Sequence, residues 1–220
     1  MKLLIRAELS KRWVLFIASL FVSGFGVAFA KSAELGVSPI SSVANVLNLR
    51  FTSISIGSWL IIWNFILIAG QVFILKRKFQ KLQFLQIPLA FIFGAFTDLG
   101  MLVVSKIEIT SYTMRLGMVL VGAVLLALGV VLSVIADVVL NSAEGFVKAI
   151  STQWKMKFEN VKICFDIGCV LLAAILSMIL LNFTISGIRE GTLIAAVLIG
   201  NIVKILNQIL CRPLKCWLKK

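Results

Sequence analysis

The sequence predicts an all-α integral membrane protein in which six transmembrane helices form two inverted repeats of three spans each. Three observations lead to this fold class. The 220 residues are 60% hydrophobic and 14% charged, with a mean hydropathy of +1.07, which is more apolar surface than one water-soluble core could bury. The chain also contains six long apolar runs, and its two halves show the same order of elements. The lipid bilayer is therefore an expected partner.

Each of the six apolar runs is long enough to cross the hydrocarbon layer, which takes about 20 mostly apolar residues. None shows the alternation of apolar and polar residues that is typical of outer-membrane strands. The first run ends in a small-residue pattern, Ala28-Phe29-Ala30, that imitates a signal-peptide cleavage site. Because the run can span the membrane, we expect it to be retained. The six predicted spans are 13–30, 54–75, 84–104, 116–136, 161–181 and 191–210.

The formal charge of +13 is distributed unevenly along the chain. With six spans, sixteen of the 22 basic residues lie on one side of the membrane and five on the other. The remaining one, Lys204, lies within the sixth span. The positive-inside rule then predicts that both termini are cytoplasmic, in the plasma membrane of a bacterium. Since topology accounts for the charge, we expect no binding of nucleic acid. The sixteen residues are Lys2, Arg6, Lys11, Arg12, Lys76, Arg77, Lys78, Lys81, Lys148, Lys155, Lys157, Lys162, Arg212, Lys215, Lys219 and Lys220.

The reactive side chains offer little catalytic chemistry. The chain has no histidine, and its four cysteines lack the spacing of a metal or redox site. A phosphate-binding loop of the Gly-x-x-x-x-Gly-Lys-Ser/Thr type is missing. The sequence offers no arrangement of a nucleophile and a base in which the acidic residues could take part in catalysis. We therefore expect neither an enzyme nor a cofactor or metal site.

The two halves of the chain resemble each other. The stretch "GVAFAKSAELGVSPISSVANVL" from Gly26 aligns with "GVVLSVIADVVLNSAEGFVKAI" from Gly129, and "LAFIFG" ending at Gly94 aligns with "AAVLIG" ending at Gly200. Three spans per half is an odd number, so the second copy must be inverted, as in many secondary transporters. The predicted repeats are 1–110, with spans 13–30, 54–75 and 84–104 and a polar segment 33–49, and 111–220, with spans 116–136, 161–181 and 191–210 and a polar segment 137–155.

Each polar segment is expected to contain a short helix. In the first, Ser38 can cap the helix and Pro39 suits the first helical position. In the second, Asn141 and Glu144 have the spacing of a capping box. Two alternatives follow. The helices either lie in the membrane interface, or fold back into the protein so that their N-termini face a central site.

The pattern "A-x-L-G-x-x-P" at residues 33–39 resembles bacterial membrane proteins of the YczE/YitT type, a group whose function is largely unassigned. Gly191-Thr192 and "GAFTDLG" around Asp98 also fit that group, which implies the same fold over nearly the whole chain. At the second turn the group commonly has Gly-x-x-Pro-x-Asp-Gly. Here Ser142 stands in the proline position and Glu144-Gly145 replaces Asp-Gly, so the resemblance is weaker at that turn.

The polar segments supply most of the candidate substrate-binding residues. Helix N-termini attract negative charge and carboxylates attract positive charge, so the pair suits a zwitterionic or cationic solute. We expect a secondary transporter of a small polar organic solute that works by alternating access. The alternative is a non-transporting membrane partner or sensor that binds a ligand or another membrane protein. The candidate residues are Glu34, Ser38, Pro39, Ser41, Asp98, Asp137, Asn141 and Glu144.

Other residues of the spans have structural interpretations. Gly24, Gly122 and Ala173 permit close approach of helices, and from them we expect a homodimer. Trp59 and Trp63 fall near one end of the second span, where an aromatic belt is expected.

Overall fold

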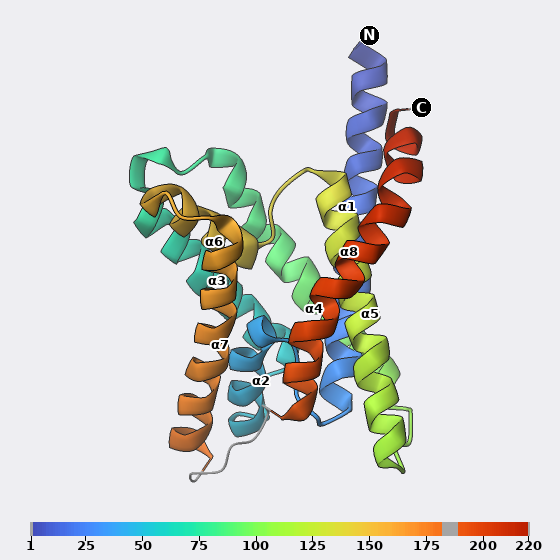
Figure 1. The fold of residues 1–220 in the computed structure, drawn as a ribbon, viewed down its shortest axis with the longest axis vertical. Helices are drawn as coiled ribbons and strands as arrows, with labels where there is room; N and C mark the ends of the chain where they lie inside the picture. Colours follow the sequence, from blue (N-terminus) through green and yellow to red (C-terminus); the bar gives the residue numbers. More distant parts are fainter. Residues whose placement is uncertain (1, 182–188, 220) are drawn as a thin grey trace.

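The computed structural model describes residues 2–181 and 189–219, and within these ranges all regular elements are helical (Figure 1). The predicted all-α class is confirmed for this part of the chain. The helices are α1 (Lys2–Ser32), α2 (Pro39–Arg50), α3 (Ile56–Leu75), the 3₁₀ helices η1 (Lys76–Lys78) and η2 (Lys81–Leu85), α4 (Gln86–Val104), α5 (Tyr112–Ala136), α6 (Ser142–Trp154), α7 (Phe158–Leu180) and α8 (Glu190–Lys219).

Six helical segments of the described residues are long and apolar enough to cross a membrane, as the sequence predicts. The last differs from its prediction, because α8 continues past residue 210 and through Pro213. Its end packs beside the start of α1, where Lys11 Nζ lies 5.5 Å from the ring centre of Trp217. The six segments are Glu8–Ser32, Ile56–Lys78, Lys81–Val104, Tyr112–Ala136, Asn160–Leu180 and Ile194–Leu218. These segments indicate a multi-pass membrane protein.

The basic clusters gather at one end of the helix bundle. The start of α1 and the end of α8 lie there, together with the connections around residues 76–81 and 155–158 (Figure 1). Residues 51–55 and 105–111 lie at the opposite end. The chain thus has a strongly basic end and a less basic end. That the basic end faces the cytoplasm remains a prediction of the positive-inside rule.

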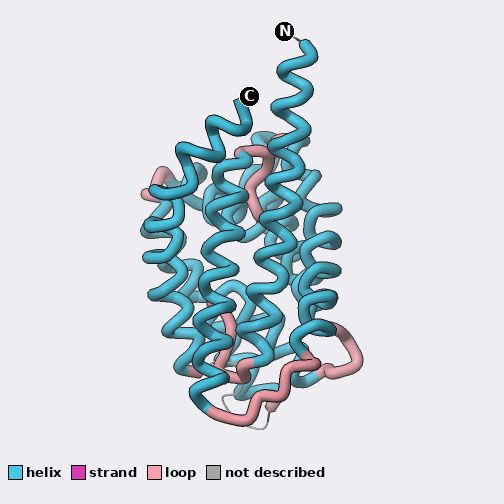
Figure 2. The backbone as a smooth tube through the Cα atoms, turned by 90° about the vertical axis from the view of Figure 1, so that its right-hand side faces the viewer, coloured by secondary structure: helices cyan, strands magenta, loops and turns pink. Residues whose placement is uncertain are grey.

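Helices α2 and α6 are too short to span a membrane, since 12 and 13 residues reach only about 20 Å. After α1, the chain turns back into the bundle, and α2 runs out again toward the less basic end; α6 starts inside the bundle and runs toward the basic end (Figure 1). Figure 2 shows loop segments lying among the helices as well as at the ends of the bundle. Six consecutive residues of α2, 41–46, are buried. The burial of α2 on all sides over these residues differs from an interfacial helix, which would leave one face open.

Helices from the two halves of the chain pack against one another. Helix α1 packs along α5 and against α4, and α5 packs against α8. Helix α2 packs on α7, and α6 packs on α3. Helices α3 and α4 cross closely, because a methyl group added at Gly57 would lie 2.2 Å from the carbonyl oxygen of Gly94.

The small residues from which we expected a homodimer are used inside the chain. Gly24 lies against the backbone of Phe96 on α4, and Gly122 lies against the backbone of Ala30 on α1. Ala173 is fully buried in a cluster between α2, α3 and α7. These residues therefore form no exposed face for a second copy, and the homodimer remains a prediction without their support.

Candidate functional site

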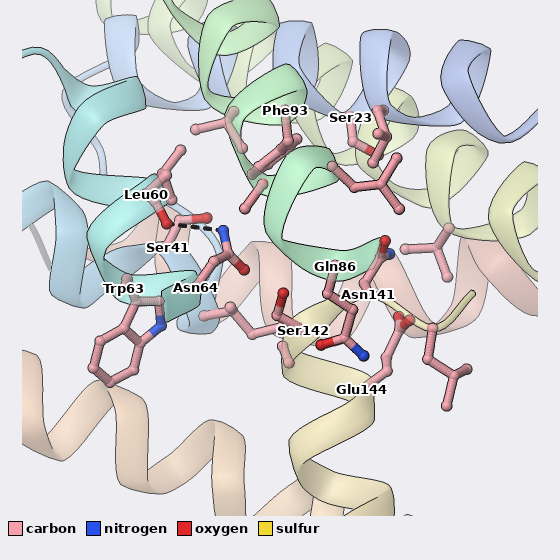
Figure 3. A pocket seen from close by; sticks show the side chains of 18 of the residues that line it. Ser23, Ser41, Leu60, Trp63, Asn64, Gln86, Phe93, Asn141, Ser142 and Glu144 are labelled. Atoms are coloured by element: carbon pink, nitrogen blue, oxygen red, sulfur yellow. Dashed lines mark hydrogen bonds between the residues drawn. The ribbon is translucent and has the colours of Figure 1, made fainter. Parts of the chain in front are cut away.

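Helices α2 and α6 begin at the same pocket in the middle of the bundle (Figure 3). Its volume is about 140 Å³. Ser38, Ile40 and Ser41 at the start of α2 and the segment 140–144 at the start of α6 line it. Helices α1, α3, α4 and α5 supply the rest of the wall. Four of the eight predicted site residues, Ser38, Ser41, Asn141 and Glu144, are thus brought together.

The pocket has an apolar side and a polar side. Polar groups come from the two short helices, from Trp63 and Asn64 on α3, and from Gln86 on α4. Most of the remaining surface comes from hydrocarbon side chains of α1, α4 and α5. These are Phe16, Leu20, Val27, Leu89, Ala90, Phe93, Leu126 and Val130. Such a wall suits a ligand that is itself partly apolar.

The start of α2 differs in one respect from the sequence prediction. Pro39 occupies the first helical position, as expected, where its missing N–H costs no hydrogen bond. Ser38 is the N-cap residue, but its side chain makes no capping hydrogen bond. Its hydroxyl instead donates to Ser41 Oγ at 3.1 Å. The predicted capping by the Ser38 side chain is therefore wrong, because the N–H of Ser41 donates to the backbone oxygen of Ser38 at 3.0 Å.

The start of α6 forms only half of the predicted capping box. Asn141 is the N-cap residue without a side-chain capping bond, so its predicted capping role is wrong. The half-buried carboxyl of Glu144 reaches back to the backbone and side chain of Asn141. Burial raises the pKa of Glu144 above its usual value of 4.5. The charge of Lys162 and the hydrogen bonds from Asn141 oppose this shift, while Asp166 adds to it.

A pair of buried glutamines fixes the start of α6. Gln71 Nε2 on α3 donates to Gln86 Oε1 on α4 at 2.9 Å and to the carbonyl oxygen of Ser142 at 3.0 Å. Gln86 Nε2 donates back to Gln71 Oε1 at 3.3 Å. Both side chains are almost fully buried. This pair was not predicted from the sequence, although each glutamine stands out as a polar residue within an apolar run.

Trp63 lies in the pocket wall and not in an aromatic belt, so that expectation was wrong for this residue. It packs in the cluster between α2, α3 and α7 and is 9% exposed. Its indole Nε1 is buried without a hydrogen-bond partner among the described residues. Figure 3 shows this nitrogen on the edge of the ring that faces Ser142 and the pocket. A buried N–H donor without an acceptor is costly, so an acceptor in the pocket would stabilise it.

Four predicted site residues do not line the pocket: Pro39, at the start of α2, and three acidic residues. Glu34 follows α1 with a positive φ of 56° and forms an ion pair with Arg115. Asp98 accepts hydrogen bonds from Ser55 Oγ at 2.6 Å and from the N–H of Gly57 at 2.8 Å, so it holds the start of α3. Asp137 ends α5 with a φ of 50° and is exposed. Of the four predicted acidic residues, Glu144 is therefore the one whose side chain lines the central pocket.

Comparison with known proteins gives one match. The model of a family described as "Family of unknown function (DUF6198)" matches residues 10–208. Neither the curated proteins nor the solved structures contain a match. The resemblance to proteins of the YczE/YitT type thus stays a prediction.

Proposed function

The chain belongs to DUF6198, a family of unknown function, and we propose that it is a secondary transporter of a small organic solute. One observation carries the proposal. Two short helices, one from each half of the chain, enter the bundle from opposite ends and begin at one central pocket. Helices interrupted in this way place their N-termini and irregular backbone at the solute site of many secondary transporters.

The packing of the helices supports two inverted repeats, 1–110 and 111–220. The contact of α1 with α4 corresponds to that of α5 with α8, and the contact of α2 with α7 corresponds to that of α6 with α3. Glu34 and Asp137, which are equivalent in the sequence alignment, both have the left-handed conformation after the first helix of their half. Two similar halves of opposite orientation can exchange roles, so the pocket would open alternately to either side.

The polar groups of the pocket favour a zwitterionic or cationic solute. The N-termini of α2 and α6 supply positive potential, and Glu144 supplies a carboxyl group. The transporter would lie in a bacterial plasma membrane with both termini in the cytoplasm, as the charge bias predicts. No enzymatic step and no cofactor form part of this proposal.

The test is transport by the purified chain in liposomes that contain no other protein. A screen for compounds that raise the unfolding temperature first identifies candidate solutes. We expect a stabilising compound to enter the liposomes and the Glu144→Gln variant to lose most of this uptake. Glu108→Gln, which changes an exposed carboxylate outside the pocket, is the matched control. A compound that binds but never crosses would contradict transport and support the alternative, a membrane sensor or partner protein.

A further inference from the structure

We propose that the solute is an amphipathic zwitterion of the α-amino-acid type with a branched aliphatic side chain. Its carboxylate would bind beside Trp63 at the start of α2, its ammonium group at Glu144, and its side chain against the apolar wall. The inference rests on the proposed function only in taking the pocket as a solute site. Each of the three contacts follows from a different feature of the pocket.

The carboxylate position follows from the unpartnered indole of Trp63. An indole N–H is a donor only, and it is most strongly satisfied by an anionic acceptor. Trp63 packs against α2 within one cluster, and the N-terminal end of a helix carries positive potential. Ser38 and Ser41 add hydroxyl groups at the same end. Because Trp63 and the start of α2 line the same pocket, the indole N–H and the positive end of the helix dipole favour an anionic group of the solute there.

The ammonium position follows from the acceptors across the pocket. Glu144 lines it from α6, and Asn64 lines it from α3. Asn64 Nδ2 donates to the carbonyl oxygen of Leu60 at 2.8 Å, and its Oδ1 points into the pocket (Figure 3). Lys162 and Asp166 on α7 form an ion pair with each other, with Lys162 Nζ at 2.6 Å from one carboxyl oxygen. Lys162 is thus engaged by Asp166, which leaves Glu144 able to bind a cationic group.

The charged and titratable surroundings of Glu144 define a pH dependence. Helix α7 presents Lys162 and Asp166, whereas α3 and α4 present the neutral amides of Gln71 and Gln86. Lys148 on α6 is exposed. An ammonium group beside Glu144 favours its ionised form. Binding of the zwitterion should therefore release a proton, and affinity should rise with pH until Glu144 is ionised in the empty protein.

The side-chain position follows from the apolar wall. Leu20 and Val27 on α1 and Leu89 and Phe93 on α4 form one side of the pocket. The volume of about 140 Å³ is close to that of an engineered apolar cavity in another protein, about 150 Å³, that holds one benzene molecule. A leucine-sized molecule suits this space better than one with an indole ring.

The experiment measures binding of four probes to purified protein by calorimetry. L-Leucine carries all three groups; 3-methylbutylamine lacks the carboxylate, 4-methylpentanoate lacks the ammonium group, and glycine lacks the side chain. We expect L-leucine to bind, and each of the others to bind about 10- to 100-fold more weakly, as expected when a hydrogen bond to a charged group or a buried aliphatic chain is lost.

Two variants assign the contacts. Trp63→Phe keeps an aromatic ring but removes the N–H. It should weaken the binding of L-leucine about 10-fold and leave the binding of 3-methylbutylamine unchanged. Trp59→Phe is the matched control, because the indole nitrogen of Trp59 is also buried without a partner among the described residues but does not line the pocket. Glu144→Gln should remove the rise of affinity with pH.

The outcomes separate this inference from the proposed function. Equal binding of L-leucine by the Trp63→Phe and Trp59→Phe proteins would overturn the carboxylate site. Failure of L-leucine to bind, together with Glu144-dependent uptake of another class of solute in liposomes, would overturn the inference and leave transport standing. Binding of L-leucine with the expected variant pattern but without uptake would support the ligand and overturn transport.

Discussion

Ser38 and Asn141, which align when the two halves of the sequence are compared, have the same backbone conformation, with φ and ψ of −58° and 151° for Ser38 and −59° and 152° for Asn141. Each immediately precedes a short helix, and both line the central pocket. Neither side chain caps its helix. Ser38 Oγ instead donates to Ser41 Oγ, and the side chain of Asn141 hydrogen-bonds Glu144, so both polar side chains belong to the wall of the pocket.

Replacement of Ser38 or Asn141 by alanine should therefore change stability little. We expect a loss of less than about 0.5 kcal/mol, against about 1 kcal/mol for a side chain that does cap, but weaker binding of the solute. Ser111→Ala is the control, because Ser111 Oγ accepts from the N–H of Met114 at 3.2 Å at the start of α5. The measurement is thermal unfolding in detergent. A loss for Asn141→Ala as large as that for Ser111→Ala would show that Asn141 caps α6 in solution.

The raised pKa of Glu144 predicts how stability depends on pH. Below its usual pKa of 4.5 the carboxyl is protonated in both the folded and the unfolded chain. Above 4.5 the unfolded chain loses this proton first, so the folded state is destabilised progressively until pH passes the raised pKa. Glu144→Gln should remove this decline. Chemical unfolding in detergent at several pH values measures it, and an identical decline in the Gln variant would assign the effect to other groups.

Much of the fold follows from the sequence because membrane spans are specified by length and polarity, which a single chain reveals directly. Whether α2 and α6 are re-entrant or interfacial does not follow from the sequence, because a short helix with one apolar face satisfies an interface and a protein interior equally well. The burial of residues 41–46 is evidence for the re-entrant alternative at α2.

The candidate site is predicted less completely than the fold. Glu144 and Asn141 were found because the capping pattern is local in sequence. Trp63, Gln71 and Gln86 were missed, because their roles arise from contacts between helices that are distant in the chain. Asp98 was included for its polarity, but a carboxylate that holds the start of a neighbouring helix has the same sequence appearance as one that binds a solute.

The buried glutamine pair predicts a test of local packing. Gln71→Leu removes one partner and leaves the amide of Gln86 and the carbonyl of Ser142 without their bonds. We expect a loss of about 1–3 kcal/mol in the free energy of unfolding. The double change Gln71→Leu/Gln86→Leu should cost less than the sum of the single changes, because no amide is then left unpaired. Strict additivity would mean that the two side chains do not interact.

The crossing of α3 and α4 predicts a strong effect of a small substitution. At Gly57 an added methyl group would meet the backbone oxygen of Gly94 at 2.2 Å, and backbone cannot move aside as a side chain can. We expect Gly57→Ala to destabilise the protein by about 1–3 kcal/mol. Gly117→Ala on α5, where nothing lies within 4 Å, should be neutral or slightly stabilising. Equal unfolding temperatures for the two variants would contradict this close crossing.

The orientation of the bundle can be tested by labelling of single cysteines. Arg77 lies at the basic end and Thr110 at the opposite end, and both are exposed. In a background with the four native cysteines changed to serine, Arg77→Cys should react with a membrane-impermeant maleimide only after the cells are opened. Thr110→Cys should react in intact cells, because the positive-inside rule predicts that the basic end faces the cytoplasm. The reverse pattern would invert the topology, and with it the side from which α2 and α6 enter the membrane, while leaving their meeting at the central pocket unchanged.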